Sequence, residues 1–501
     1  MTEGRLWDLL SIPAQMDPSR EILRYEGRSW TYEGLMAASV RFEPALLQAT
    51  SIMDVNTDLT VALVYASFLA GSELALLNFR LRVEEVEKIF ERHATGAFLA
   101  GVRYEDIARR VARDRLASSV GLLDTARFGI DTLEEAETPA MREETTVKSV
   151  ADVVLFTSGT SSSPKPVVIG GTSLVAYVAG TTPLPSAETA NQATLLTMPL
   201  FHVAGLVGLL RSVFMGRRVV IHPQFEAETW LAGVEEEEIT HTFVVPTMLR
   251  RILDSKGYSQ SRVASLEVLS YGGGPMPPSL IEEVLDRFPG SVRFVGTYGL
   301  TEAGGTVCVL SPEDHDDARH GEAALSRLHS VGLPVHGIRV AILGGDRNEL
   351  EPGDVGEVYV AGARLPPADE CVSGLGRRWV RTGDLGHLDR DGYLHLHGRV
   401  DDVIIRGGEN ISPLEIERVL LAHPTVRQVA VVGTPDETWG ERIVAFLVVR
   451  EPISSAVLVD HCRERLATFK VPDAFHFADR LPMTSTSKVM KHRLRHRLSK
   501  G

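Results

Sequence analysis

Short apolar runs alternate with amphipathic segments along most of this chain. Residues 150–156 (VADVVLF) and 239–246 (ITHTFVVP) are apolar runs of strand length, which are typical of buried strands. Residues 83–93 (VEEVEKIFERH) and 280–288 (LIEEVLDRF) repeat apolar side chains at the spacing of a helix face. This alternation predicts α/β layers over residues 1–400.

The pattern becomes smaller in scale after GRVDD, residues 398–402. The remainder predicts a compact α+β domain of about a hundred residues, which is a usual domain size. We therefore expect a domain boundary near Asp401. The elements expected in this small domain are helices over 413–423 and 456–467 and strands over 426–433 and 442–449.

Composition and charge argue against several classes of protein. Of the 501 residues, 44% are hydrophobic and 24% are charged, which is ordinary for a globular protein. A formal charge of -14 argues against nucleic acid as a main partner, because nucleic acid usually needs a basic face. Cys308, Cys371 and Cys462 lie too far apart for a disulfide framework or a zinc motif. No signal-peptide pattern and no run long enough to span a membrane is found, so a cytoplasmic enzyme without a membrane partner is expected.

Two charge-rich stretches could be interpreted as metal sites. Residues 312–322 (PEDHDDARHGE) carry His and Asp at ligand-like spacing, but they lack apolar periodicity, which favours an exposed loop. The four glutamates at 235–238 point in different directions on a helix, which favours a solvated helix face.

A hydroxyl-rich turn follows the apolar run that ends at Phe156. Residues 156–171 read FTSGTSSSPKPVVIGG. Backbone N–H groups in such a turn bind anions, hydroxyl groups add donors, and Lys165 adds positive charge. The turn is not a Walker loop, because Pro164 precedes the lysine and no Ser or Thr follows it. A phosphate-binding loop and a Ser/Thr-rich surface loop both remain open on this stretch alone.

Five further stretches indicate a family. They are PLFH (199–202), SYGGGPMPP (270–278), TYGLTEAGG (297–305), RTGDLGHLDRDGYLHLHGRVDDVIIRGGENISPLEIE (381–417) and PMTSTSKV (482–489). With the hydroxyl-rich turn, they resemble the ordered core motifs of the adenylate-forming superfamily, in its acyl- and aryl-CoA synthetase branch. The resemblance covers nearly the whole chain. It implies a large N-terminal α/β domain (1–400) of layered sheets flanked by helices with a small β-rich subdomain, and a small mobile α+β domain (401–501) that carries the lysine motif.

The resemblance implies a two-step ligase. A carboxylate attacks the α-phosphate of ATP and forms an acyl adenylate, then the small domain rotates and a thiol attacks the adenylate. The molecules implied are a carboxylic acid, ATP (or acyl-AMP), Mg2+ and coenzyme A. Tyr298 and the glycine strip at 272–274 would sandwich the adenine. The implied nucleotide-binding residues are Thr157, Ser158, Gly159, Thr160, Lys165, Gly272, Gly273, Gly274, Tyr298, Gly299, Thr301, Asp384 and Arg399.

The residue types suit the roles that the resemblance implies. Glu302 could hold Mg2+, which offsets charge on phosphate oxygens. Thr301 offers a hydroxyl to the α-phosphate, and Asp384 could accept hydrogen bonds from the ribose hydroxyls. Lys488, on the small domain, would neutralise charge near the carboxylate during adenylation. The implied catalytic residues are Lys488, His202, Glu302 and Thr301.

The second step and the acyl pocket have matching residues. Asp401 stands at the hinge position of the family, where a residue absorbs a large backbone change. His202 stands where amino-acid-activating relatives use an acidic residue, so an α-amino acid is disfavoured. The implied coenzyme A site consists of Gly407, Gly408, Trp439 and Gly440, with core packing as the alternative for Trp439. The implied acyl pocket consists of Phe201, His202, Val245, Gly272, Gly296 and Gly304, whose glycines would leave room for a bulky acid.

The hydroxyl-rich turn departs from the family pattern TSGTTGxPKG. Ser162 and Pro166 stand where glycines are usual, and Ser487 replaces the glycine before Lys488. Proline lacks an N–H and serine resists a positive φ, so we expect a weaker grip on the β- and γ-phosphates and intact adenylate binding. Three hypotheses follow: a complete acid–CoA ligase, a half-enzyme that only transfers acyl groups from an adenylate made by a separate adenylating partner, and a non-catalytic adenylate-binding scaffold. Coenzyme A is the expected acceptor, and a separate carrier protein is the second.

Overall fold

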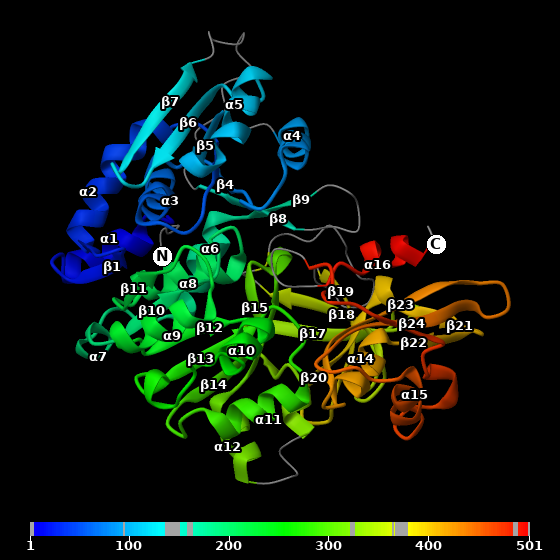
Figure 1. Ribbon diagram of the computed structural model, residues 1–501. Coiled ribbons are helices and arrows are strands. Elements are labelled where there is room, and N and C mark those ends of the chain that lie inside the picture. The colour runs from blue at the N-terminus through cyan, green and yellow to red at the C-terminus, as the bar shows by residue number, and fades with distance from the viewer. Residues whose placement is uncertain are drawn as a thin grey trace.

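Two large sheets dominate the N-terminal part of the protein (Figure 1). The computed structural model describes residues 5–93, 96–135, 151–157, 164–320, 326–362, 365, 379–483 and 489–498. The first sheet has seven strands in the order β7-β6-β5-β3-β4-β8-β9. Its strands are β3 (Thr50–Met53), β4 (Leu74–Leu76), β5 (Ala97–Gly101), β6 (Ser119–Asp124), β7 (Gly129–Glu135), β8 (Val153–Thr157) and β9 (Lys165–Ile169). The helices of this region are α1 (Asp8–Met16), α2 (Tyr32–Phe42), α3 (Asp58–Ala70), α4 (Val83–Arg92) and α5 (Glu105–Arg113).

The second sheet has nine strands in the order β16-β15-β14-β13-β12-β10-β11-β1-β2. They are β1 (Glu21–Tyr25), β2 (Arg28–Thr31), β10 (Ala193–Leu196), β11 (Arg218–Ile221), β12 (His241–Val244), β13 (Val268–Gly272), β14 (Arg293–Leu300), β15 (Gly305–Leu310) and β16 (Leu333–Pro334). The helices of this region are α6 (Gly171–Thr181), α7 (Ala187–Ala190), α8 (Val203–Phe214), α9 (Ala227–Glu236), α10 (Pro246–Leu253), α11 (Pro278–Arg287) and α12 (Pro312–His320).

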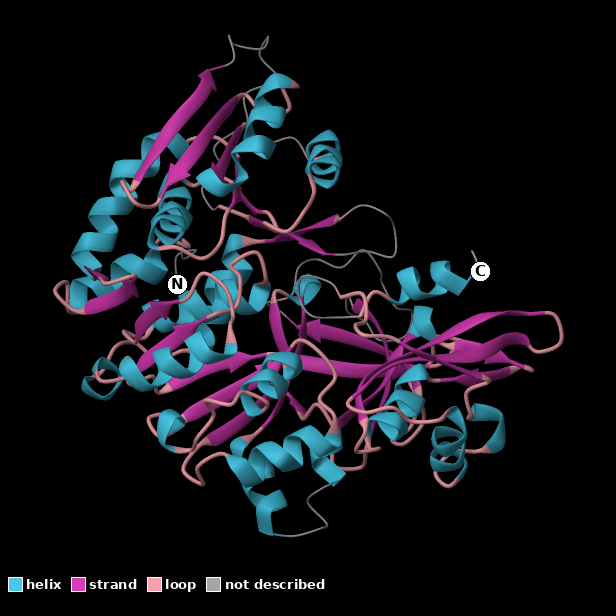
Figure 2. Ribbon diagram, in the orientation of Figure 1, coloured by secondary structure: helices cyan, strands magenta, loops and turns pink. Residues whose placement is uncertain are grey.

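Two smaller sheets complete the fold, in yellow to red in Figure 1. An antiparallel sheet of four strands contains β17 (Ile338–Leu343), β18 (Gly356–Gly362), β19 (Val380–Leu388) and β20 (Leu394–Arg399). The C-terminal sheet contains β21 (Ile404–Arg406), β22 (Glu409–Ile411), β23 (Val426–Asp436), β24 (Gly440–Val449) and β25 (Ala474–Phe477). Its helices are α14 (Pro413–Leu421), α15 (Ser455–Arg463) and α16 (Lys491–Leu498). Figure 2 shows the same division by element type, with a mixed α+β end after β20.

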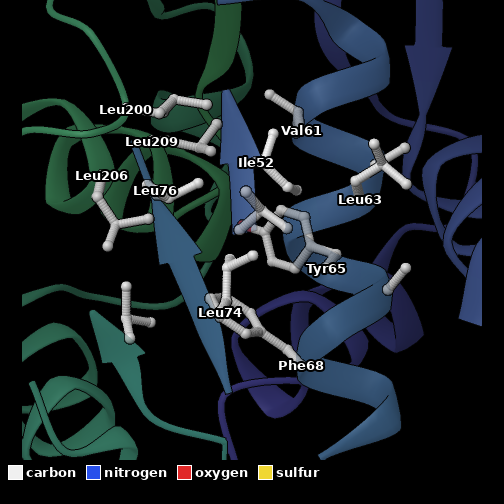
Figure 3. Close-up of a cluster of buried hydrophobic side chains, with 14 of the residues drawn as sticks. Ile52, Val61, Leu63, Tyr65, Phe68, Leu74, Leu76, Leu200, Leu206 and Leu209 are labelled. Atoms are coloured by element: carbon white, nitrogen blue, oxygen red, sulfur yellow. The ribbon is translucent and has the colours of Figure 1, made fainter. Parts of the chain in front are cut away.

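A hydrophobic core joins the two large sheets. Helix α3 is apolar on nearly all sides and almost completely buried, as expected for a helix inside a layered domain. Figure 3 shows its side chains, including Tyr65 and Phe68, beside Leu74 of β4 and Leu209 of α8. The core therefore fixes the seven-stranded sheet against the loop and helix that follow β10.

The expected α/β domain with a smaller α+β domain is confirmed, and so are the elements that periodicity predicted. The predicted exposed loop at 312–322 is wrong for its first part, which forms α12. Asp314 of this helix accepts a hydrogen bond from the hydroxyl of Tyr393 at 2.7 Å, and His315 hydrogen-bonds with the hydroxyl of Tyr271 at 2.9 Å. The buried positions of α12 carry polar side chains with hydrogen-bond partners, so the helix shows no apolar periodicity in the sequence. The prediction of a loop was wrong for this reason.

Candidate active site

The carboxyl ends of neighbouring strands bring most of the motif residues to one edge of the nine-stranded sheet. Strands β10, β12, β13 and β14 run parallel, so their carboxyl ends lie together. Ligands of open α/β sheets bind at this edge. The residues placed there are Phe201 and His202 after β10, Val245 after β12, Gly272 to Gly274 at the end of β13, and Tyr298 to Glu302 at and after the end of β14.

The carboxylate of Asp384 is held by two donors beside this edge. The hydroxyl of Tyr298 donates to Oδ2 at 2.5 Å, and Nη1 of Arg399 donates to Oδ1 at 2.8 Å. Arg399 also donates to the carbonyl oxygen of Thr382 at 2.9 Å. The structure therefore brings together Tyr298, Asp384 and Arg399, which come from three strands of two sheets.

Burial and charge keep Tyr298 neutral and Arg399 charged. Burial, followed by the neighbouring Asp384 carboxylate, raises the pKa of Tyr298 well above its usual value. Burial opposes the charge of Arg399, but the pKa of its guanidinium is still raised, because Asp384 lies beside it. Tyr298 thus stays a donor and Arg399 stays a cation, and the remaining lone pairs of Asp384 can accept hydroxyl donors.

The end of β13 presents a flat surface of backbone. A methyl group on Gly272 would lie 2.4 Å from the carbonyl oxygen of Thr297, so only glycine fits there. Gly273 has φ +74° and a methyl group on it would have Val245 as its neighbour at 3.5 Å, whereas one on Gly274 would meet only Pro246, at 3.9 Å. Such a strip allows a planar ring to approach the backbone closely.

A short turn after β14 carries Thr301 and Glu302. The 3-10 turn η4 (Thr301–Ala303) is closed by the N–H of Gly304, which donates to the carbonyl oxygen of Thr301 at 2.9 Å. Strand β9 packs against this turn. The charge of Glu302 also acts on the guanidinium of Arg399, so the carboxylate lies within electrostatic range of the Asp384 group.

The expected phosphate loop is only partly within the described residues. Thr157 ends β8 and Lys165 begins β9, and the two face each other across the hairpin. Ser158, Gly159, Thr160 and Ser162 lie outside the described residues, as do Ser487 and Lys488.

Pro166 lies in β9 opposite Phe156, which corrects its assignment to the loop. Strand β9 is an edge strand, where proline is tolerated because one side of the strand needs no ladder hydrogen bond.

The residues expected to line an acyl pocket lie near the same edge, but the glycines do not all leave space. A methyl group on Gly296 would lie 3.0 Å from the hydroxyl oxygen of Tyr271 and 3.0 Å from Cβ of Leu310. The expected room for a bulky acid is therefore not found at Gly296. A methyl group on Gly304 would contact Ile169 at 3.4 Å, and the ring of Phe201 is buried 4.5 Å from that of His202.

Three of the four expected coenzyme A residues come into contact in the C-terminal domain. The N–H of Gly407 donates to the carbonyl oxygen of Trp439 at 2.8 Å, and Gly440 pairs with Arg406 between β24 and β21. Trp439 is 52% exposed, which excludes core packing for its ring. Gly408 has φ +86° and open space around it.

Arg406 lies within the motif at 381–417, but the motif predicts no role for it. Its guanidinium lies 5.6 Å from the centre of the Trp439 ring and donates to both carboxylate oxygens of Asp473, at 2.9 and 2.7 Å. The sequence shows the charge of Arg406. It does not show its partners Trp439 and Asp473, because they lie 33 and 67 positions further along the chain.

The hinge position lies between the four-stranded sheet and the C-terminal sheet. Asp401 is exposed in the 3-10 turn η6 (Val400–Asp402), directly after β20. The next residue is Asp402, whose Oδ1 forms an ion pair with Nη2 of Arg495 in α16 at 2.9 Å. Helix α14 packs against β20, and Arg418 donates to the carbonyl oxygen of Leu396 at 3.3 Å.

Neither a clustered metal site nor a membrane span is found in the described part of the chain. No group of three or more His, Cys, Asp or Glu side chains is placed to hold a metal ion there. None of the described helices is long and apolar enough to cross a membrane.

The chain matches a family model described as AMP-binding enzyme over residues 11–366, and the model of its C-terminal domain over residues 415–488. The chain belongs to the AMP-binding enzyme family. The expected membership of the adenylate-forming superfamily, and with it the class of acid–thiol ligases, is confirmed.

Relatives of this AMP-binding enzyme match along almost their whole length. The 2-succinylbenzoate–CoA ligase of Bacillus subtilis is 32% identical, with 99% of this chain and 98% of that protein covered. The fatty acid–[acyl-carrier-protein] ligase ScoC of Streptomyces coeruleorubidus is 31% identical over 97% of this chain and 95% of its own length.

Solved structures show the same fold. The o-succinylbenzoate CoA synthetase of Bacillus subtilis with its acyl-adenylate intermediate has a TM-score of 0.81 at 31% identity and covers 98% of each chain. The same enzyme with ATP and a magnesium ion has a TM-score of 0.78 at 31% identity, covering 98% of this chain and 99% of that one. ATP, AMP and magnesium are thus ligands of close structural relatives, in agreement with the expected nucleotide site.

Proposed function

We propose that this protein activates a carboxylic acid with ATP and transfers the acyl group to coenzyme A. The observation that carries the proposal is the Asp384 group, whose carboxylate is held by Tyr298 and Arg399 beside the glycine strip. Thr301 and Glu302 follow on the same sheet edge. A ribose hydroxyl, an adenine ring and the α-phosphate can each find a partner of suitable chemistry there.

The residues present fit a magnesium nucleotide. Mg2+ in such sites usually takes one or two protein carboxylates, while phosphate and water oxygens complete its coordination, and Glu302 is a single carboxylate beside a cation. Glu302 would hold the ion, which supplies charge stabilisation to the phosphate oxygens. Thr301 would donate to the α-phosphate, and Lys488 would orient the attacking carboxylate during the first step.

The C-terminal residues suit the second step. We propose a hinge at Asp401 and a domain boundary near it, as expected from the sequence. After rotation, Gly407 and Gly408 would lie beside the thiol-bearing arm of coenzyme A, because glycine allows close approach of a slender ligand. The exposed ring of Trp439, with Arg406 on its face, would contact the remainder of the cofactor.

The acid that we propose carries no α-ammonium group, since His202 offers no charge partner for one. An aryl or fatty acid fits the class of acids named for the relatives. Coenzyme A is the proposed acceptor, and ScoC makes a separate carrier protein the second candidate. A cytoplasmic location stays a prediction from the sequence.

The half-enzyme hypothesis rests on Ser162 and Pro166, of which Pro166 lies within strand β9. Two assays separate the hypotheses. Pyrophosphate exchange with a panel containing 2-succinylbenzoate and fatty acids tests adenylation, and capture of coenzyme A by a synthetic acyl adenylate tests thiolation. We expect both activities, with Lys488→Ala cutting exchange far more than capture. Capture without exchange would establish the half-enzyme, and binding of AMP or adenylate without either activity would support the adenylate-binding scaffold.

A further inference from the structure

The side-chain amide of Asn56 connects two segments that are far apart in the sequence. Its Nδ2 donates to the carbonyl oxygen of Met198 at 2.9 Å, and its Oδ1 accepts from the N–H of Leu200 at 3.0 Å. Asn56 is 2% exposed and lies between β3 and α3. A side chain from the loop between β3 and α3 therefore holds the loop that follows β10.

This loop needs such a partner. Met198 and Leu200 lie beyond the end of β10, outside its ladder, and Pro199 between them has no N–H. A buried backbone donor and a buried backbone acceptor without partners would each destabilise the fold, because both lose their hydrogen bonds to water. A planar amide can satisfy one of each polarity at once, which a carboxylate or an apolar side chain cannot.

The loop that Asn56 holds continues into Phe201 and His202, which are expected to line the acyl pocket. The N–H of His202 donates to the carbonyl oxygen of Pro199 at 3.0 Å. A methyl group on Gly205 would lie 2.2 Å from that oxygen, so α8 begins pressed against the loop. The ring of Phe201 lies edge-on to Phe79, which follows β4, with centroids 5.3 Å apart. Polar and apolar contacts from the seven-stranded sheet thus set where Phe201 and His202 stand.

We propose that Asn56 is a positioning residue for the acyl group, which acts by fixing the loop that carries Phe201 and His202. The proposal rests on the proposed function, in which these two residues line the acyl pocket. The Asp384 group lies on other strands and is expected to be independent of Asn56. Loss of the amide should therefore weaken contacts to the acyl group and leave contacts to the nucleotide unchanged.

The test compares two ligands on four proteins. Calorimetry would measure the affinities for AMP and for 5′-O-(N-benzoylsulfamoyl)adenosine, a stable mimic of an aroyl adenylate. The proteins are the wild type, Asn56→Leu, Asn56→Asp and the control Thr240→Val. Thr240 also bonds to buried backbone, the N–H and carbonyl oxygen of Ala193 at 3.0 Å each, but at the opposite end of β10.

We expect Asn56→Leu to weaken binding of the mimic by at least tenfold with AMP affinity unchanged, since a displacement of about 1 Å can cost two decades in such sites. Thr240→Val should lower the melting temperature and leave both affinities unchanged. In Asn56→Asp, the new carboxyl group mimics the amide only when protonated. Affinity of this variant for the mimic, relative to the wild type, should therefore recover as the pH falls, with no such recovery in Asn56→Leu.

Parallel losses for AMP and the mimic, or an equal effect of Thr240→Val, would overturn the positioning role. Unchanged affinity of a folded Asn56→Leu for the mimic would also overturn it. If the wild type binds neither ligand, the proposed function fails and the positioning role with it, which is a distinct result.

Discussion

Asp384 and Arg399 face each other across β19 and β20, and a hydrogen bond of 2.8 Å joins their side chains. The pair lies on the four-stranded sheet, while Tyr298, which binds the other carboxylate oxygen, lies on the nine-stranded sheet. The hydrogen bond between Tyr298 and Asp384 therefore connects the two sheets at the proposed ribose site.

Asp384→Ala should lower the affinity for AMP by about 10- to 100-fold, because a hydrogen bond to a charged group contributes roughly 1.5–3 kcal/mol. The matched control is Asp346→Ala, since that carboxylate bonds only within a turn, to Asn348. Calorimetry with AMP measures both. Unchanged affinity in Asp384→Ala would remove Asp384 from the nucleotide site.

His397 should make stability depend on acid pH. Burial, then the neighbouring His387 and Arg418, lowers its pKa from 6.5 to about 4. Between these values the unfolded chain binds a proton that the folded protein does not, so stability falls as the pH drops from 6.5 towards 4. Because Arg418 belongs to α14, a charged His397 would also repel the C-terminal domain.

Thermal unfolding between pH 7.5 and 4.5 tests this expectation. His397→Gln should lose less stability over that range than the wild type, whereas His492→Gln, on the exposed face of α16, should follow the wild type. Identical pH profiles for all three proteins would show that His397 does not cause the loss of stability at acid pH.

Gly408→Leu should block thioester formation from a supplied adenylate while adenylate binding stays nearly unchanged. Gly408 has φ +86° and open space around it, so a side chain there would project freely and also strain the backbone. Gly353→Leu is the control for backbone strain. Gly353 has φ +101° and open space around it, but it lies in a turn outside the proposed site. Normal thioester formation in Gly408→Leu would show that the assigned coenzyme A path is wrong.

Ser162→Gly should raise the rate of pyrophosphate exchange if the serine limits phosphate binding, since glycine adopts the positive φ that serine resists, and each donor aimed at a phosphate oxygen can contribute about two to three decades in rate. Pro166→Gly should raise exchange less than Ser162→Gly does, because Pro166 lies within an edge strand, where proline is tolerated. A rise with Pro166→Gly and none with Ser162→Gly would reverse the roles given to these two residues.

Periodicity along the chain predicted the layered fold, and the ordered motifs predicted a nucleotide site through their resemblance to a family. Strand β12 and helix α4 were predictable because burial repeats at the period of each element. Asp384, Arg399 and Tyr298 were expected from the ordered motifs, and the structure brings their side chains together.

The distant side chains that complete each group are visible only in the folded protein. Asn56 and Met198 are 142 positions apart, and no local pattern distinguishes that asparagine from one in a surface turn. The buried face of α12 depends on Tyr271 and Tyr393, and the space beside Gly296 depends on Tyr271 folding across it. Such contacts arise from the packing of whole elements, whereas periodicity records only whether a position faces the interior.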